Sequence, residues 1–153
     1  MTGPEGGVSE TVVRLLGPDD ASVLTEVAEG VFDHEIDRGL LHEFLSDPRH
    51  HLAVAVTDGR VTGMASAVHY VHPDKPPELW INEVGVADSA RGRGLGRRLV
   101  QALLDHARAI GCQAAWVLTE HENAAACALY AGRGGRPEST VLYSWRLDQG
   151  PKP

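Results

Sequence analysis

The chain has 153 residues, with 14 Lys and Arg against 21 Asp and Glu, which gives a formal charge of −7 when its eight His are neutral. This length is typical of one domain, and 42% hydrophobic with 23% charged residues excludes the disordered, collagen-like and membrane-spanning classes. The acidic balance argues against a nucleic-acid binder and favours a cationic partner.

Two features of the sequence bear on its compartment. Cys112 and Cys127 are the only cysteines and form no C-x-x-C pair, so neither a disulfide scaffold nor a zinc ribbon is expected. Residues 1–10 lack the basic start and apolar run of a secretion signal, and no apolar stretch reaches membrane-spanning length. We therefore expect a cytoplasmic protein with no membrane segment, a flexible leader at 1–10, one domain at 11–148 and a tail at 149–153.

The first half of the chain predicts two helices and a hairpin. A strand at 11–16 precedes a helix at 18–32, in which Val23, Leu24, Val27, Ala28 and Val31 recur at helical spacing. A second helix is expected at 37–46. Strands at 50–56 and 61–71 are joined by Asp-Gly at 58–59, a pair that readily supplies the positive φ angles of a tight turn.

The second half alternates strands with helices. After a proline-rich loop at 72–78, the pattern predicts a strand at 79–87, an amphipathic helix at 94–110, a strand at 113–119, an alanine-rich helix at 123–131 and a closing strand at 141–147. Strands that come first, followed by helices between strands, indicate the α/β (α+β) class, with a mixed, mostly antiparallel central sheet and helices on both faces.

The most informative stretch is Arg91-Gly-Arg-Gly-Leu-Gly-Arg-Arg98, between an apolar strand and the strongest helix. Small residues at the start of a helix let backbone N–H groups approach an anion, and the helix dipole favours negative charge there. The spacing fits neither a dinucleotide-binding loop nor a P-loop, so redox and NTP chemistry are disfavoured. The alternative is a glycine turn with solvated arginines, but four bases concentrated in an acidic chain favour the anion site.

These residues resemble a known family. Arg91-x-x-Gly94-x-Gly96 is similar to the R-x-x-G-x-G/A motif of the GCN5-related N-acetyltransferases (GNAT superfamily), and Glu122-Asn123-x-x-Ala126-x-x-Leu129-Tyr130 resembles their second signature. The resemblance implies the GNAT fold and acetyl-CoA as co-substrate. It implies contacts to acetyl-CoA from Arg91, Gly92, Arg93, Gly94, Leu95, Gly96 and Arg97 at the pyrophosphate, from Val84, Gly85 and Val86 at the pantetheine arm, and from Asn123.

The chemistry requires a base, because an alkylammonium must lose a proton before it can attack a thioester. Glu83 lies in an apolar strand next to the glycine loop, and the resemblance implies that it is this base; a strand acid paired with arginine or facing solvent is the alternative. The resemblance further implies direct transfer in a ternary complex, with Tyr130 protonating the CoA thiolate; Tyr130 packed on the sheet is the alternative. Cys127 is interpreted as a small apolar filler.

The eight histidines do not indicate a metal site. His50 and His51 point to opposite faces of a strand, and His69 and His72 have no third plausible ligand nearby, so no metal is expected. His121, between two glutamates, is either an acceptor contact or an ordinary loop histidine.

Charge suggests the nature of the acceptor. Residues 19–47 hold nine acids against one base, and in the GNAT resemblance this segment borders the acceptor cleft, where it would attract a polycation. The chain further resembles aminoglycoside 3-N-acetyltransferases of the gentamicin-resistance type through residues 16–20, 31–35, 70–73 and 128–130. That resemblance implies substrate contacts from Glu83 and Glu120 and from Asp33 or Glu35.

The sequence therefore predicts an acetyl-CoA-dependent aminoglycoside N-acetyltransferase, acting at the 3-amino group of 2-deoxystreptamine and giving antibiotic resistance. The resemblance also implies a homodimer paired through C-terminal strands. Acetylation of a polyamine or a protein amine is the first alternative, and a non-catalytic acetyl-CoA-binding module is the second.

Overall fold

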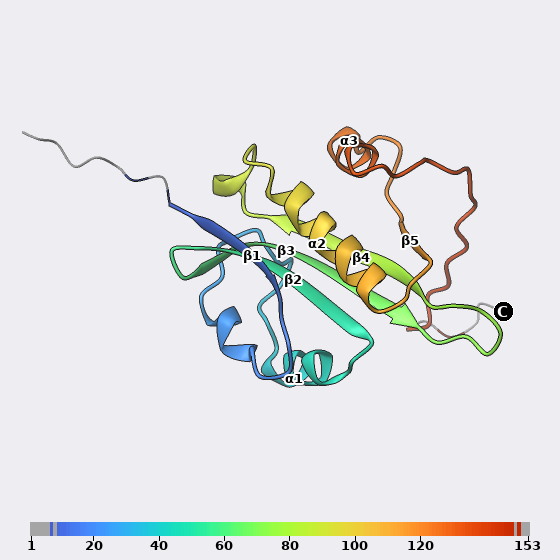
Figure 1. Ribbon diagram of the computed structural model, residues 1–153, viewed down its shortest axis with the longest axis horizontal. Helices are drawn as coiled ribbons and strands as arrows, with labels where there is room; N and C mark the ends of the chain where they lie inside the picture. The colour runs from blue at the N-terminus through green and yellow to red at the C-terminus, as the bar shows by residue number, and fades with distance from the viewer. Residues whose placement is uncertain (1–6, 8, 149, 151–153) are drawn as a thin grey trace, which may run out of the picture.

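The computed structural model describes residues 7, 9–148 and 150, which contain a five-stranded sheet in the order β1-β2-β3-β4-β5 (Figure 1). The strands are β1 (Thr11–Leu15), β2 (His50–Thr57), β3 (Arg60–Tyr70), β4 (Glu78–Val86) and β5 (Ala114–Val117). All neighbours are antiparallel except β4 and β5, which are parallel. The expected mixed, mostly antiparallel sheet is confirmed.

The β2–β3 hairpin forms where the sequence predicts it. Thr57 pairs with Arg60, and the two residues between them have positive φ, 50° at Asp58 and 74° at Gly59. Both values suit the mirror-image turns that match the twist of a hairpin.

Helices cover both faces of the sheet (Figure 1). On one face, the α2 face, α2 (Leu95–Ala109) packs against β1, β2, β3 and β4. On the other, the α1 face, α1 (Arg38–Ser46) packs against β2, and the 3₁₀ turn η1 (Ala21–Thr25) packs against β3. The side chains that α2 buries are those of Leu95, Leu99, Val100, Leu103 and Ala107. Four of these residues recur every four positions on one side of the helix, which agrees with the amphipathic helix expected at 94–110.

Strand pairing fixes which face each β4 side chain occupies. A Cβ added at Gly63 would lie 3.1 Å from Leu99 Cδ1, so Gly63 faces α2. Side chains alternate along a strand and cross-strand partners share a face. The pairing therefore places Val84, Val86 and Ile81 on the α2 face, and Trp80, Glu83 and Gly85 on the α1 face; a register shift between the Ser66–Glu83 and Ala67–Ile81 pairs breaks the alternation of β4 there.

The helix expected at 18–32 is wrong beyond its first turns. Only η1 forms, and the chain then leaves the helical path: Ala28 N donates to Val61 O, Val61 N donates to Glu26 O, and Gly30 has a φ of 84°. Ala28 and Val31 are nevertheless buried against the core. Their helix-like spacing thus reflects a loop that packs inward at intervals while it is anchored to the edge of β3.

The closing strand expected at 141–147 is also wrong in this structure. After α3 (Ala124–Gly132), the described residues 135–147 have no regular structure. They run past the sheet on the side of β5 (Figure 1). The expected leader at 1–10 and tail at 149–153 lie largely outside the described residues. In the part of the chain that is described, no helix combines the length and apolarity needed to cross a membrane.

Candidate active site

The site is built at a fork between β4 and β5. The two strands pair only from Glu78 to Ile81 on β4, whereas β4 continues to Val86. Ala87 N donates to Thr62 O of β3, and amides alternate in direction along a strand, so the amides of Val84 and Val86 point away from β3 into the fork. An extended ligand can therefore pair with this edge of β4 as a strand would.

A glycine-rich loop lies at the end of β4 and leads through η2 (Asp88–Ala90) into α2. Gly92 and Gly94 have φ values of 76° and 73°, and Gly94 is the N-cap of α2 without a side-chain capping bond. The first amides of α2 are thus left available for an anion. Among the described residues Arg91 is paired with Asp88 and Arg98 donates to Thr11 O, while Arg93 and Arg97 form no ion pair.

Residues 91–97 and the amides of Val84 and Val86 together form what we call the donor side of the fork. Glycines that admit close approach, exposed helix-start amides and arginines fit a pyrophosphate, and the free strand edge fits an amide-bearing arm. The residues present therefore fit acetyl-CoA.

Helix α3 completes the donor side. A Cβ added at Gly96 would lie 3.3 Å from Leu129 Cδ2, so Gly96 allows α3 to pack on the first turn of α2. Asn123, predicted to contact acetyl-CoA, caps α3: its Oδ1 accepts from Ala126 N at 3.0 Å. Its side-chain amide has no hydrogen-bond partner among the described residues and can make a second contact.

Glu83 projects from the α1 face of β4 beside the fork and is partly buried. Burial raises the pKa of its carboxyl, and the negative charge of Asp33 raises it further. The negative charge of Asp33, from a segment distant in the sequence, therefore acts on the Glu83 carboxyl. A base with a raised pKa takes a proton more readily from an ammonium ion.

A backbone contact explains why Asp33 is close. Gly85, two residues after Glu83, faces the loop of residues 26–36, and a Cβ there would lie only 2.2 Å from Val31 O. Only glycine admits such an approach without a shift of the loop. Gly85 thus lets the loop cross β4 and carry Asp33 toward Glu83. The sequence assigned Gly85 to the pantetheine arm and gave no sign of this contact.

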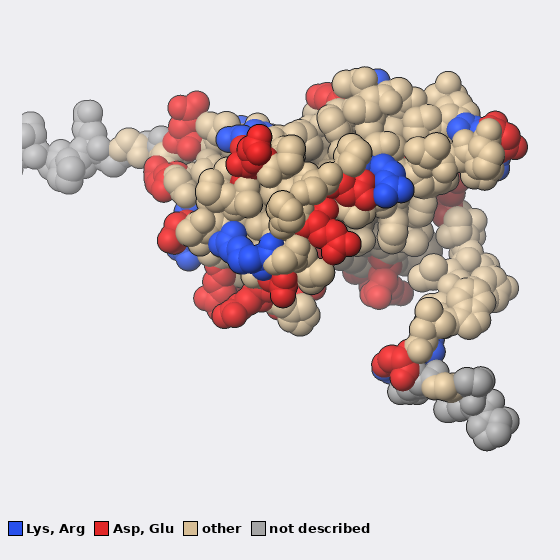
Figure 2. All heavy atoms as spheres, turned by 90° about the horizontal axis from the view of Figure 1, so that it is seen from below, with Lys and Arg blue, Asp and Glu red and all other residues tan. Residues whose placement is uncertain are grey.

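Tyr130 lies on α3, half-buried against the core. Burial raises the pKa of its hydroxyl, and the nearby Cys127 thiol adds to this. The phenol therefore stays protonated at neutral pH, as a general acid requires. Other predicted contacts are not gathered at Glu83 by any described interaction: Glu35, Glu120 and His121 are exposed in loops. Figure 2 views the α1 face and shows acidic side chains along much of it.

Sequence reasoning missed two tertiary clusters. On the α2 face, His106 Nε2 lies 3.0 Å from His51 Nδ1, and His51 Nε2 lies 2.8 Å from His69 Nδ1. The three imidazole rings are joined by hydrogen bonds. Among the described residues, no group of three or more His, Cys, Asp or Glu side chains could hold a metal ion. On the α1 face, Trp80 stacks on Trp116. Strand register and the placement of α2, which the sequence pattern does not contain, bring these residues together.

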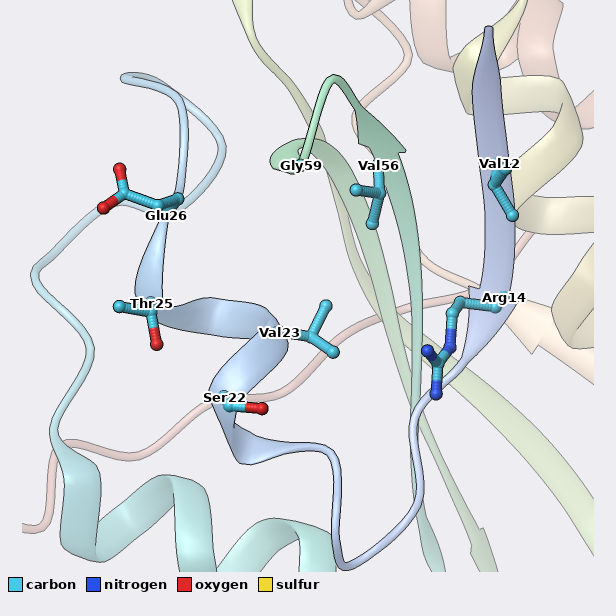
Figure 3. Close-up of a pocket in the computed structure, with 8 residues that line it drawn as sticks. All are labelled: Val12, Arg14, Ser22, Val23, Thr25, Glu26, Val56 and Gly59. Carbon is cyan, nitrogen blue, oxygen red and sulfur yellow. The ribbon is translucent and has the colours of Figure 1, made fainter.

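A hollow of about 350 Å³ lies apart from the fork, between β1, η1 and the β2–β3 turn (Figure 3). Val12, Val23 and Val56 supply its apolar wall, and Arg14 at its rim is paired with Asp20. It contains none of the candidate catalytic residues. The candidate active site is the open fork.

Comparisons with known proteins agree with this geometry. Residues 20–134 match the model of the acetyltransferase (GNAT) family. Among curated relatives, L-2,4-diaminobutyric acid acetyltransferase of Nocardia farcinica is 31% identical over 97 residues, 63% of this chain and 49% of that protein. Mycothiol acetyltransferase of Pseudarthrobacter chlorophenolicus is 30% identical over 153 residues, 92% of this chain and 47% of that protein. The chain spans about half the length of the curated relatives it matches.

Solved structures share the fold at low identity. An aminoglycoside acetyltransferase from an uncultured soil sample, in complex with trehalose, has a TM-score of 0.77 and 18% identity, covering 90% of this chain and 95% of that one. Aminoglycoside N-acetyltransferase AAC(6')-Iy in complex with CoA has a TM-score of 0.73 and 21% identity, covering 95% and 99%. At such identities the likeness shows the fold alone.

Proposed function

The chain belongs to the acetyltransferase (GNAT) family, and we propose that it transfers the acetyl group of acetyl-CoA to an aminoglycoside, at the 3-amino group of the 2-deoxystreptamine ring. One observation carries the proposal. Beside the fork, Glu83 has a pKa raised by burial and by the negative charge of Asp33, which belongs to the acid-rich residues 19–47. Such a field attracts a compact molecule with several ammonium groups.

The residues of the fork divide the reaction between them. The donor side binds acetyl-CoA, which supplies an activated acyl group as a thioester. Glu83 accepts the proton that the acceptor ammonium loses, and the neutral nitrogen attacks the carbonyl carbon. A β4 amide pointing into the fork, that of Val84 or Val86, donates to the carbonyl oxygen. Tyr130 donates a proton to sulfur as the carbon–sulfur bond breaks, and the second proton that the nitrogen loses on becoming an amide restores the Tyr130 hydroxyl through solvent.

The test is a panel assay of CoA release with acetyl-CoA and sisomicin, gentamicin, spermidine, diaminobutyric acid or a peptide with a free N-terminus. We expect turnover with the two aminoglycosides and a product acetylated at the 3-amino nitrogen by NMR. Expression in a susceptible host should raise the inhibitory concentration of the same drugs. Release no faster than in buffer with both aminoglycosides contradicts the substrate, and an acetyl group on another nitrogen contradicts the position.

A smaller amine is the second candidate. Its support is the relative named for L-2,4-diaminobutyric acid, which matches 63% of this chain at 31% identity. If diaminobutyric acid or spermidine turns over and the aminoglycosides do not, this candidate replaces the first. CoA binding without turnover of any panel amine favours the non-catalytic module.

We also propose that two copies pair through residues 140–147. Within the described residues β5 has a strand partner, β4, on one edge only. The apolar side chains of the C-terminal segment are 74–92% exposed, namely Val141, Leu142, Tyr143, Trp145 and Leu147. An unpaired strand edge and an exposed apolar segment each favour association. Light scattering should give twice the mass of one chain, and Leu142→Asp should halve it; a wild-type monomer contradicts the proposal.

A further inference from the structure

Two tryptophans form a stacked pair on the α1 face of the sheet. Trp80 of β4 and Trp116 of β5 are register partners, with ring centroids 5.5 Å apart and planes inclined by 15°. Trp116 is 39% exposed, and Leu118, just beyond β5, is 49% exposed. Large exposed apolar surface beside a polar site is a usual mark of a binding surface.

The pair lies on the same face as Glu83. Trp80 pairs with Val68 and Glu83 pairs with Ser66, and these two β3 residues are two apart, so their partners share one face. From Trp80 to Glu83 the strand advances three residues, about 10 Å. The helical turns of this face lie over β2 and β3, which leaves the stacked indoles at the open end of the face.

The arrangement selects for a particular chemistry. Indole faces attract cations within about 6 Å and offer a flat apolar surface. Glu83 lies at the other end of the same surface, and the loop that carries Asp33 crosses β4 there at Gly85. A ring-bearing molecule with ammonium groups at opposite ends satisfies both, whereas an uncharged aliphatic molecule satisfies only the apolar surface and an anion satisfies neither.

We propose that the Trp80–Trp116 pair is a platform that holds the body of a ring-bearing polyamine acceptor, so that one of its amines reaches Glu83. This inference rests on the proposed transfer to an amine and specifies what selects the acceptor. The two indoles act as specificity-determining residues, because they contact the acceptor body and not the reacting nitrogen.

The kinetic test compares Trp116→Ala, Trp116→Phe and Val12→Ala. Val12 is 52% exposed on β1, at the opposite edge of the sheet, so its variant controls for loss of exposed apolar bulk. Trp116→Ala should raise the KM for sisomicin about tenfold, a difference equivalent to about 1.4 kcal/mol. The KM for acetyl-CoA and kcat should stay within about twofold, and Trp116→Phe should recover most of the loss. Unchanged sisomicin KM, or an equal rise in acetyl-CoA KM, overturns the platform.

A binding test separates this inference from the proposed function. With CoA present instead of acetyl-CoA, no acetyl group can be transferred. In a Trp145→Phe background, Trp80 and Trp116 are the two tryptophans that remain, so tryptophan emission reports on this pair. We expect a saturable change in emission with sisomicin that Trp116→Ala weakens about tenfold, and a weaker response to the linear amine spermidine. Binding without turnover leaves the platform standing while the aminoglycoside activity fails. If turnover of sisomicin occurs and Trp116→Ala does not change it, the aminoglycoside activity stands and the platform fails.

One rival occupant gives a different result. If Trp116 is instead covered by the C-terminal segment of a second copy, Trp116→Ala lowers the mass found by light scattering and leaves the amine titration unchanged. That result, or the absence of any saturable response to sisomicin, overturns the inference.

Discussion

In the proposed reaction, the two sides of the fork recognise their ligands by different means. Apart from its arginines, the donor side consists of backbone amides freed by local conformation: the positive φ of Gly92 and Gly94, an uncapped helix start and an unpaired strand edge. The acceptor side consists of side chains from three segments, Asp33 in a loop, Glu83 and Trp80 on β4, and Trp116 on β5. Backbone recognition depends little on side-chain identity, whereas acceptor selection depends on it entirely. The donor should therefore be shared across such folds and the acceptor specific to each.

The largest expected effect is on the acceptor side. Glu83→Gln keeps the shape of the side chain but removes the base, so kcat should fall by roughly 100-fold or more, within the range usual for general-base catalysis. The acetyl-CoA dissociation constant should not change.

The pH profile refines this prediction. Because burial and Asp33 raise the pKa of Glu83, the acid limb of kcat/KM should lie above the ordinary carboxylate range, and Asp33→Asn should move it toward acid. A Glu83→Gln enzyme with the wild-type rate removes Glu83 from the chemistry.

We expect the free energy of unfolding to fall at acid pH because of a histidine on the α2 face. Burial, aided by the charges of His106, His69 and His50, lowers the pKa of His51 to about 4. The unfolded chain binds a proton at this imidazole below about pH 6.5 and the folded chain does not, so stability is present at neutral pH and is lost as the pH falls.

Between pH 6.5 and pH 4.5 the free energy of unfolding should fall by roughly 2 kcal/mol more in the wild type than in His51→Gln, as measured by urea denaturation. Identical slopes against pH in the two chains would show that the His106–His51–His69 chain contributes nothing.

A backbone change should disturb the donor side alone. Gly94→Ala forces a side chain into a left-handed conformation at a cost of about 1–2 kcal/mol. We expect the KM for acetyl-CoA to rise about tenfold and the KM for the amine to stay within twofold. Gly111→Ala is a matched control, since Gly111 also has positive φ, at 86°, but lies at the far end of α2.

The smallest expected effect separates two roles of Asn123. Asn123→Ala removes the cap of α3 and should lower stability by about 1 kcal/mol, whereas Asn123→Asp keeps a capping oxygen and should restore it. If acetyl-CoA KM rises equally in both variants, the side-chain amide binds acetyl-CoA as the sequence predicts. If it rises in neither, Asn123 is only a cap.

The correct predictions concern local backbone structure, as on the donor side, and the missed features depend on contacts between distant segments, as on the acceptor side. The hairpin at Asp58-Gly59 and helix α2 depend on signals between near neighbours, and both were predicted correctly. The helix at 18–32 failed because apolar residues at intervals of three and four also suit a loop that packs inward. The strand at 141–147 has the right composition, but a strand requires a partner. The Trp80–Trp116 pair and the three-histidine chain depend on register and helix placement, which no local pattern encodes.

The most direct test of the proposed division between a donor side and an acceptor side is a set of initial rates in which acetyl-CoA and sisomicin are both varied. The rates are measured for the wild type, Gly94→Ala and Trp116→Ala. The account predicts that Gly94→Ala raises only the acetyl-CoA KM and Trp116→Ala only the sisomicin KM, each by about tenfold. Two variants that each raise both constants to the same extent would contradict it.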